Sequence, residues 1–294
     1  MYKRQPKVAR KIDKLKNDRI HGASWLAQQA ISTLSFAVEQ SSARAITQFM
    51  EEIKAVAREL RQAKPSMIPI ANYADQFLQQ VMAKSCHEDN LDSLKSYARG
   101  VGKELNKSAA KALSKAVEYG CGIINDLDTV ITCSYSSTVC DLLRLAWRRE
   151  TEFQVIVAES RFEDKTYGQI TARELRKCGI PVEIIPDSSI GLRLPQANKA
   201  LVGADSITVD GYLINGKPTL LLAETARESK IPLYVICETA KFDISSYTAT
   251  FIEAEPGFDK TPLELVTGII TEKGTMQPSL VIAYIEQMAQ LPQR

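Results

Sequence analysis

Two side chains that could move protons stand where apolar, strand-like runs end in this sequence. Cys133 closes the run of residues 129–133 and opens into the serine-rich turn of residues 134–138, while Asp205 closes the run of residues 200–205. In an open parallel sheet, the carboxyl ends of the strands border the crevice in which small ligands bind. A thiol, a carboxylate and several hydroxyls converging there predict proton transfer on a small anionic substrate.

Each of the two groups also has a purely structural interpretation. Because helix N-termini lower the pKa of a thiol, we expect the helix that follows Cys133, residues 139–149, to favour the thiolate. The alternative is a buried cysteine that packs as a small hydrophobic residue. Asp205 could act as an acid or base, or it could cap a turn. The position of each residue leaves both interpretations open.

The turn after Cys133 has the composition of an anion site. Ser134, Ser136 and Ser137 offer hydroxyls and backbone amides just ahead of a helix, an arrangement that binds phosphate. Serine-rich turns are also ordinary helix caps. Arg161, just after the next strand, could contact a phosphate through two nitrogens, or form a surface salt bridge instead.

Composition excludes several classes of protein. The chain has 294 residues, a net charge of +2 and 45% hydrophobic residues, as globular proteins do. A nucleic-acid partner would require a one-sided basic excess, so none is expected, and the basic first 19 residues are predicted to form a solvated helix face. No apolar run approaches the roughly 20 residues that span a bilayer, and no apolar signal core begins the chain. We therefore expect a cytoplasmic protein without membrane contact.

The cysteines and histidines do not suggest a metal centre. The six cysteines lack the spacing of paired metal ligands, and there are only two histidines. We expect reduced thiols and no metal site.

The first half of the chain has helical periodicity. Apolar residues recur at helical spacing in four segments, residues 24–36, 43–63, 71–83 and 91–117. The sequence Lys64-Pro65-Ser66 is expected to break the chain between the second and third segments, because proline disfavours helix in the residue before it. These segments predict a helical N-terminal domain over residues 1–122.

After residue 122 the period changes to that of an α/β domain, predicted over residues 123–294. Apolar strands with little polar alternation are separated by helices, which indicates a mainly parallel sheet covered on both faces. Asp210-Gly211 is a hairpin signal. The expected strands are residues 129–132, 153–158, 182–186, 200–207 and 233–237, the helices between them are residues 139–149, 169–177, 188–194 and 219–228, and residues 262–290 are expected to form two more helices.

Several motifs, in order, resemble one protein family. The segments are residues 202–207, 210–211, 214–215, 219 and 221–226, together with Gly22-Ala23, Lys64-Pro65-Ser66, Glu159-Ser160-Arg161 and residues 238–242, 258–262 and 269–272. This pattern is similar to methylthioribose-1-phosphate isomerases, ribose-1,5-bisphosphate isomerases and the regulatory subunits of eukaryotic translation initiation factor 2B. The resemblance covers nearly the whole chain.

The resemblance implies a fold, an activity and an assembly. It implies a helical N-terminal domain, a Rossmann-like C-terminal domain, a homodimer and no cofactor. Cys133 and Asp205 match the pair that the family isomerases use in enolisation, and initiation-factor subunits commonly lack this pair. Ser134-Tyr135-Ser136 resembles a turn of those subunits, however. The apolar residues 280–291 could supply part of a dimer surface, or pack on their own domain.

The resemblance also implies a binding shell for a phosphorylated substrate. This chain departs from the family where His21 and Lys64 replace arginines, and where Asn215-Gly-Lys-Pro-Thr219 replaces Asn-Lys-x-Gly-Thr. Lysine cannot reproduce the two-pronged contact of arginine. The implied substrate-binding residues are His21, Gly22, Ala23, Lys64, Ser134, Ser136, Ser137, Arg161, Asn215, Lys217 and Lys241.

Two functions follow from the sequence. The first is an aldose–ketose isomerase for a phosphorylated sugar, nearest to the ribose-1,5-bisphosphate branch. The alternative is a non-catalytic subunit that senses a sugar phosphate or nucleotide and controls a partner protein. If His21 binds the phosphate, the affinity should weaken as the pH rises from about 6 to 8, since its reference pKa is about 6.5.

Overall fold

The computed structural model describes residues 5–244 and 256–290. The chain divides into two compact units, one running to Lys111 and the other from Ala112 to Gln290. This division falls within α5 (Leu91–Cys121). The domain boundary placed at residue 122 and the roles given to the two domains stay predictions.

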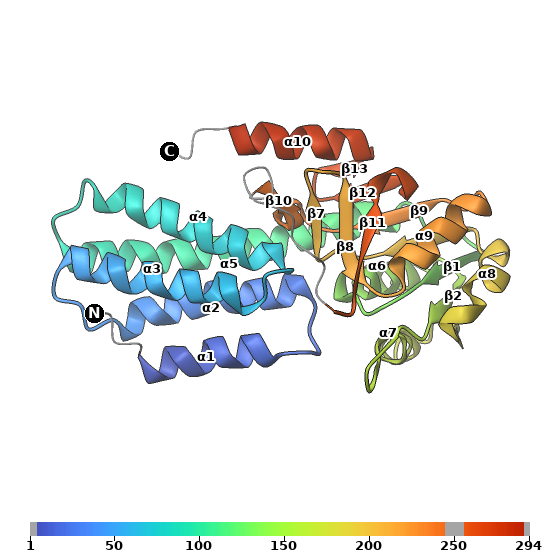
Figure 1. The fold of residues 1–294 in the computed structure, drawn as a ribbon, viewed down its shortest axis with the longest axis horizontal. Coiled ribbons are helices and arrows are strands. Elements are labelled where there is room, and N and C mark those ends of the chain that lie inside the picture. Colours follow the sequence, from blue (N-terminus) through green and yellow to red (C-terminus); the bar gives the residue numbers. More distant parts are fainter. Residues whose placement is uncertain (1–4, 245–255, 291–294) are drawn as a thin grey trace. The chain divides into compact units, whose positions relative to one another are not determined.

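The first unit is helical, as predicted (Figure 1). Each helix is amphipathic and buries one stripe: α3, for example, buries Phe49, Ile53, Val56 and Leu60. The break at Pro65 is confirmed, because one helix ends at Ala63 and the next begins at Ile68. The helices are α1 (Pro6–Asn17), α2 (Ala23–Gln40), α3 (Ile46–Ala63), α4 (Ile68–Ser85) and the first part of α5.

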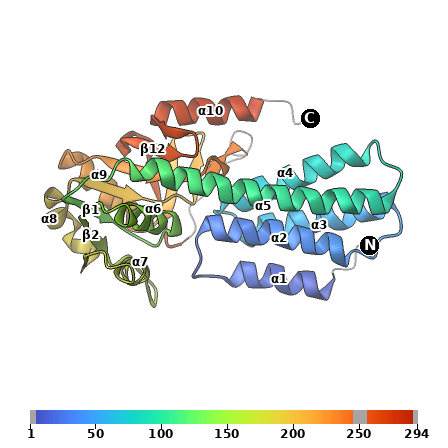
Figure 2. The same cartoon turned by 180° about the vertical axis from the view of Figure 1, so that it is seen from behind.

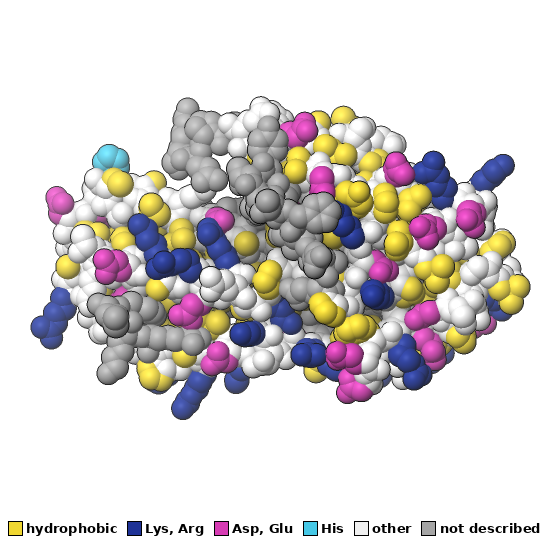
Figure 3. Space-filling view, in the orientation of Figure 1, with side chains coloured by type: hydrophobic (Ala, Val, Ile, Leu, Met, Phe, Trp, Pro, Cys, Tyr) yellow, Lys and Arg dark blue, Asp and Glu magenta, His cyan; other side chains and the backbone are white. Residues whose placement is uncertain are grey.

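Helix α1 carries the basic N-terminal segment. It buries Val8, Ile12 and Leu15 and leaves its lysines and arginines exposed. The predicted solvated face is therefore confirmed for the described residues, while Lys3 and Arg4 lie outside them. Figure 3 shows basic and acidic side chains interspersed on the visible surface. None of the helices within residues 5–244 and 256–290 combines the length and apolar character that a bilayer crossing requires.

The second unit is built on a sheet in which the described residues contribute seven strands, in the order β13-β12-β9-β6-β1-β2-β5. Every pairing is parallel except that of β12 with β13. The chain moves outward from β1 through β2 to β5, then crosses back to β6 and continues to β12. The strands are β1 (Asp128–Thr132), β2 (Phe153–Ala158), β5 (Val182–Ile185), β6 (Lys199–Val202), β9 (Leu233–Ile236), β12 (Gly268–Thr271) and β13 (Gly274–Met276).

Both faces of this sheet are buried, which explains the continuous apolar strands. Successive residues of a strand point to opposite faces, so Val130 joins one core and Ile131 the other. The end of α5 with α6 (Ser137–Arg148) and α7 (Tyr167–Arg176) covers the first face (Figure 2). The helices α8 (Ile190–Arg193), α9 (Thr219–Glu228) and α10 (Pro278–Gln290) cover the second.

A smaller sheet interrupts the alternation of strands and helices. Its order is β10-β7-β8-β11, with β7 (Ser206–Thr208) and β8 (Tyr212–Gly216) antiparallel around Asp210-Gly211. Gly211 has a φ of +83°, so the predicted hairpin is confirmed. The other two strands are β10 (Phe242–Asp243) and β11 (Phe258–Pro262).

Two predicted elements are wrong. The strand predicted over residues 200–207 is two strands, β6 and β7, in different sheets, because the chain turns at residues 203–205. Residues 262–290 form one α-helix, α10, rather than two. The β-branched run Ile269-Ile270-Thr271 pairs with residues 274–276, and Gly274 provides the turn with a φ of +103°.

Candidate active site

Cys133 and Asp205 lie at the same edge of the large sheet, after neighbouring strands. Cys133 directly follows β1, and Asp205 lies three residues beyond the last residue of β6, with β1 and β6 paired in parallel. The direction in which strands are added reverses between these two strands. Ligands of open α/β sheets bind at this switch point, outside the carboxyl ends of the strands. The sequence-predicted pair therefore lies at the edge where open α/β sheets commonly bind their ligands.

Asp205 is not the last residue of a strand, as the sequence suggested, but part of the link between the two sheets. Its backbone amide donates to Ile214 O at 2.9 Å, which attaches the link to β8. Asp205 is half-buried. A carboxylate on a link fixed at both ends is held in place by the two sheets.

Two glycines dock the serine turn onto this link and onto β8. A Cβ atom at Gly203 would lie 2.4 Å from Ser136 Oγ, and one at Gly216 would lie 2.2 Å from Ser134 Oγ. A side chain at either position would therefore displace the serine that packs against it. The departure from the family pattern at Gly216 has a local reason, since Ser134 occupies the space that a side chain would fill.

The serine turn is further fixed by the loop after β2. The Ser134 amide donates to Ser160 Oγ at 2.6 Å, and Thr171 Oγ1 donates to Ser134 O at 2.7 Å. Ser134 and Ser160 both have left-handed backbones, with φ of 60° and 53°. Such conformations in residues other than glycine need support from their surroundings and cluster at functional sites.

The start of α6 uses one serine as a cap. Ser136 Oγ accepts from the Val139 amide at 3.3 Å, so its side chain serves the helix. Ser137 is the first residue of α6 and is half-buried. The positive end of the dipole of this 12-residue helix lies beside the switch point.

The thiol of Cys133 is buried, and its pKa moves in the direction opposite to our expectation. Its exposed fraction is 2%. Burial raises the pKa of Cys133 to about 12, and Asp259 and Asp187 add to this, while a hydrogen bond with Thr219 partly opposes it. The expected stabilisation of the thiolate by the following helix is thus outweighed by desolvation. The group in this structure is a thiol.

Thr219 is a neighbour of the thiol that sequence reasoning missed as a site residue. Its Oγ1 lies 3.5 Å from Cys133 Sγ and accepts from Asn215 Nδ2 at 2.9 Å. Thr219 begins α9 and has no exposed surface. The signal available in the sequence was its place at the end of the Asn215–Thr219 motif.

The cationic residues of the second unit differ in their surroundings. Arg161 is exposed at the start of β3 (Arg161–Phe162), which pairs with β4 (Lys165–Thr166), and Lys217 is also exposed. Lys241, in contrast, is only 3% exposed and lies 3.7 Å from Glu238. In this structure a carboxylate already faces the ammonium that was predicted to bind substrate.

The predicted site residues of the first unit gather around Asp18. His21 Nδ1 lies 2.8 Å from Asp18 Oδ2, and Lys64 Nζ donates to Asp18 O at 2.5 Å. The His21 ring also stacks on Trp25, with 3.8 Å between the ring centroids. His21 is therefore held by both contacts, and its Nδ1 is taken up by the hydrogen bond with Asp18. Gly22 is the N-cap residue of α2, and the side chain of Ala23 is buried.

Burial and hydrogen bonding act in opposite directions on Asp18. Burial raises its pKa, but hydrogen bonds from the His21 and Ile20 amides and the His21 ring outweigh it, so the net pKa is lowered. Asp18 therefore stays ionised and keeps a negative charge beside His21 and Lys64. The predicted residues thus fall in both units: those of the first unit gather around Asp18, and Cys133, Asn215 and the serine turn lie close together in the second.

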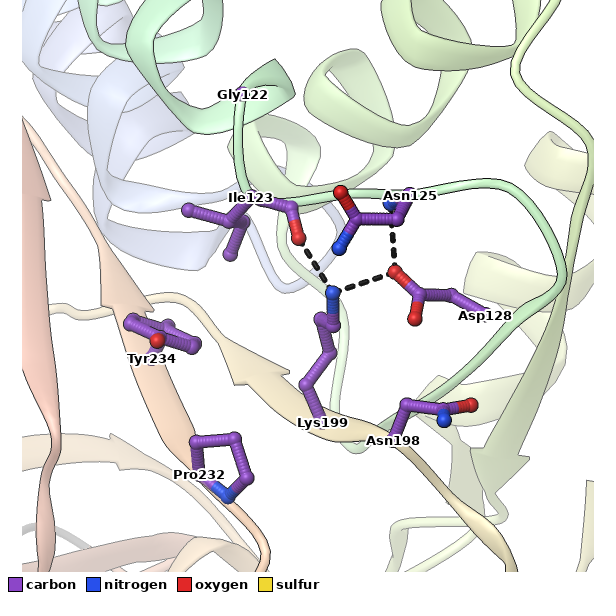
Figure 4. Close-up of a pocket in the computed structure, with 8 residues that line it drawn as sticks. All are labelled: Gly122, Ile123, Asn125, Asp128, Asn198, Lys199, Pro232 and Tyr234. Atoms are coloured by element: carbon purple, nitrogen blue, oxygen red, sulfur yellow. Dashed lines mark hydrogen bonds and ion pairs between the residues drawn. The ribbon is translucent and has the colours of Figure 1, made fainter.

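A pocket of about 490 Å³ lies at the opposite edge of the large sheet (Figure 4). Lys199 Nζ points toward Asp128 and Ile123 O, at 2.5 Å from each, and the Asn125 amide donates to the same Asp128 oxygen. No sequence pattern pointed to this ion pair. The pocket is lined by Gly122, Ile123, Asn125, Asp128, Asn198, Lys199, Pro232 and Tyr234.

A metal site is not indicated by the part of the chain that the structure describes, where no three His, Cys, Asp or Glu side chains form a group that could hold an ion. The six cysteines are free thiols, four of them buried.

A protein-family model described as the initiation factor 2 subunit family matches residues 19–257. This chain belongs to that family. The match includes Cys133, Asp205 and Thr219, and it confirms the resemblance drawn from the sequence motifs.

The curated relatives in this family carry two kinds of name. A ribose 1,5-bisphosphate isomerase of Thermococcus kodakarensis is 30% identical, with 94% of this chain and 92% of the relative covered. A putative translation initiation factor eIF-2B subunit 2-like protein of Pyrococcus horikoshii is 36% identical, with 91% and 95% covered.

Solved structures agree with the fold. A translation initiation factor eIF-2B of Pyrococcus horikoshii superposes with a TM-score of 0.83 at 31% identity, covering 95% of this chain and all of the other. A β2δ2 eIF2B complex of C. thermophilum gives a TM-score of 0.79 at 19% identity, which supports the fold alone.

Proposed function

We propose that this protein is a sugar-phosphate aldose–ketose isomerase similar to ribose-1,5-bisphosphate isomerase. The observation that carries the proposal is the placement of Cys133 and Asp205 on either side of the sheet's switch point, with Gly203 docking the turn of one against the link of the other. The relatives named ribose 1,5-bisphosphate isomerase support it. No metal or organic cofactor is required.

In the proposed reaction, the sugar ring opens and Cys133 as thiolate takes the proton from C2. The electron pair forms a C1=C2 enol as the bond between C1 and the ring oxygen O4 breaks, and the thiol then returns the proton to C1. Because O1 carries the phosphate ester, Asp205 moves the proton of the O2 hydroxyl to O4, which leaves a carbonyl at C2 and balances the protons. A positioned acid or base typically contributes 10²–10⁴-fold to the rate.

The raised pKa of Cys133 sets a condition on this mechanism. A thiol with a pKa of about 12 is ionised on the order of one part in 10⁵ at pH 7. A substrate phosphate would disfavour the thiolate further. The protein's own donors, above all the Thr219 hydroxyl and the start of α6, must therefore support the charge.

The phosphate is assigned to the serine turn, the start of α6 and the exposed side chains of Arg161 and Lys217. Helix amides and an arginine fork bind phosphate oxygens well. Among the residues predicted from the resemblance, His21 and Lys241 are paired with carboxylates and are weaker candidates for direct contact.

Two substitutions test the reaction. Cys133→Ser and Asp205→Asn should each lower turnover of ribose 1,5-bisphosphate by about 10²–10⁴-fold while the circular-dichroism spectrum stays that of the parent. Cys86→Ser, at an exposed thiol, is the control and should keep the parent rate. Unchanged turnover in either site variant contradicts the mechanism.

The second candidate function is a ligand-sensing subunit without catalysis. The specific observation in its favour is that the thiol is protonated and that two predicted phosphate ligands, His21 and Lys241, face carboxylates. Relatives named as eIF-2B subunit-like support the same alternative. A stoichiometric protein partner in the source lysate, with no isomerase activity in the purified chain, would favour sensing.

A thermal-shift screen distinguishes ligands for either function. Pentose and hexose phosphates, methylthioribose phosphate and nucleotides should be compared at equal concentration. A ligand at about 100 times its dissociation constant stabilises the protein by about 2.7 kcal/mol. Stabilisation by ribose 1,5-bisphosphate with turnover supports the isomerase, and stabilisation by a nucleotide alone supports the sensor.

The protein is further proposed to act as a cytoplasmic homodimer. Leu280 on α10 is exposed and apolar, as expected of a surface that a second copy covers; Leu291 lies outside the described residues. Light scattering at micromolar protein should give twice the chain mass of 32.6 kDa. A single species at the chain mass contradicts the dimer.

A further inference from the structure

The hydroxyl of Thr219 lies close to three polar atoms but has only one proton to donate. Its Oγ1 lies 2.6 Å from Gly216 O, 2.9 Å from Asn215 Nδ2 and 3.5 Å from Cys133 Sγ. A threonine hydroxyl has one proton to donate and two lone pairs to accept with. The identities of the three partners fix how these are used.

Gly216 O is a carbonyl and can only accept, so it takes the Thr219 proton. Asn215 Nδ2 is an amide nitrogen and can only donate, so it fills one lone pair. The remaining lone pair faces Cys133 Sγ, and the arrangement is complete only if the thiol donates its proton to Thr219. Since Thr219 and Asn215 are both buried, an unmade hydrogen bond would not be replaced by water.

We propose that Thr219 is a positioning residue that holds the Cys133 thiol proton and then turns its own hydroxyl to the sulfur when the thiol is deprotonated. The kinetic consequence rests on the proposed isomerase function, whereas the hydrogen bond itself does not. The thiol proton passes to solvent hydroxide, and no proton leaves Thr219, whose O–H rotates from Gly216 O to the thiolate.

The surroundings support a rotor at this position. Thr219 is the first residue of α9. The backbone amide of Leu220 beside it donates to Asp259 Oδ2 at 3.0 Å and so does not compete for the Thr219 hydroxyl. Asp259 and Asp187 both disfavour a charge on the sulfur, while the Thr219 hydrogen bond favours it. Thr219 thus offers the thiolate a neutral donor beside these two acidic residues.

Infrared spectroscopy of the S–H stretch tests the resting hydrogen bond without reference to activity. The band of Cys133 is isolated by subtracting the spectrum of Cys133→Ala. It should lie at the lower frequency of a hydrogen-bonded thiol in the parent and in Thr219→Ser. It should move to the frequency of a thiol without an acceptor in Thr219→Val.

The matched control is Thr225→Val, which removes a hydroxyl from the same helix, one bonded to Leu221 O, and should leave the band in place. If Thr219→Val does not fold, Thr219→Ala is measured instead. A Cys133 band already at the unbonded frequency in the parent, or one unmoved in the variants, overturns the proposal.

The second half of the proposal, donation to the thiolate, is tested by the rate at which iodoacetamide labels Cys133, followed by peptide mass spectrometry at pH 8. Thr219→Val should label at least about tenfold more slowly than the parent, since a hydrogen bond to a charged group is lost. Thr219→Ser and Thr225→Val should match the parent. Equal labelling in Thr219→Val and the parent overturns the rotor.

The kinetic readout separates this proposal from the proposed function. If the parent isomerises the sugar phosphate, the basic rise of its pH–rate profile should shift to higher pH in Thr219→Val and return in Thr219→Ser. If the parent has no activity, the isomerase assignment fails while the infrared and labelling results still decide the role of Thr219.

Discussion

The two ends of strand β1 bury polar groups in opposite ways. Asp128 at its start is paired with the Lys199 ammonium, next to an open pocket. Cys133, just after its end, is hydrogen-bonded to the neutral hydroxyl of Thr219, and Asp259 and Asp187 disfavour a charge on its sulfur. Burial with an opposite charge gives a fixed clamp, whereas burial without one keeps the Cys133 thiol protonated.

The pocket at the amino end is lined by a neutralised ion pair, and the predicted proton-transfer pair lies at the other end. Substitutions at the Asp128–Lys199 pair should lower the stability of the protein, whereas substitutions around Cys133 and Asp205 should lower its proposed turnover.

The largest effect on stability is expected at Lys199. Lys199→Met leaves Asp128 buried without its partner and should lower the free energy of unfolding by about 3–5 kcal/mol. Urea denaturation measures it. Lys260→Met breaks a more exposed pair with Asp210 and is the control, with an expected loss below about 1 kcal/mol. Equal losses in the two variants would remove the contrast between a buried clamp and a surface pair.

The glycines that dock the serine turn come next. Gly203→Ala and Gly216→Ala should each lower the free energy of unfolding by about 1–3 kcal/mol, because the added methyl overlaps Ser136 or Ser134. Both should also lower turnover, since they displace the turn after Cys133. Gly191→Ala, with open space around it, should not destabilise the protein; a similar loss there would argue against steric docking.

A smaller effect follows from the raised pKa of Cys133. A thiol with a pKa near 9.0 when unfolded and about 12 when folded binds its proton more tightly in the folded state. Its contribution is complete below pH 9 and is lost as the pH rises toward 12, by about 1.4 kcal/mol at pH 10. Urea titrations should therefore show the parent losing stability relative to Cys133→Ala between pH 8 and 10. The exposed Cys86→Ala should show no such relative change.

The smallest effect concerns the residues that flank β1. Leu127, just before the strand, is 85% exposed and left-handed with a φ of 64°. Leu127→Asn should raise the free energy of unfolding by up to about 1 kcal/mol, since asparagine tolerates this conformation. Leu192→Asn, at a residue that is also exposed but lies on helix α8, should give no gain, and a gain of the same size there would point to polarity rather than backbone strain.

Elements whose periodicity is set by burial were predictable from the sequence. The strand predicted over residues 153–158 matches β2, which packs on the core with both faces. The helix predicted over residues 219–228 matches α9, which packs on the core with one stripe. The region around residues 268–276 was not, because short β-branched runs next to a glycine turn have no distinguishing period until the strand β9 beside them is known.

The sequence predicted where the candidate site lies, but not the protonation state of the Cys133 thiol. The strand ends located Cys133 and Asp205 near one edge, because topology follows from the alternation of strands and helices. The direction of the Cys133 pKa depends on burial beneath α9, and Thr219 reaches the thiol from 86 residues away in sequence. Such contacts between distant segments leave no local spacing to recognise.

The two docking glycines give the serine turn a mechanical role. Because the turn rests on Gly203 of the link and on Gly216 of β8, it is packed tightly between the link and the smaller sheet. A ligand that draws the turn toward its phosphate would also displace the Asp205 link and the Asn215–Thr219 segment. If the serine turn binds phosphate as proposed, binding would move the carboxylate and the hydroxyl beside the thiol together.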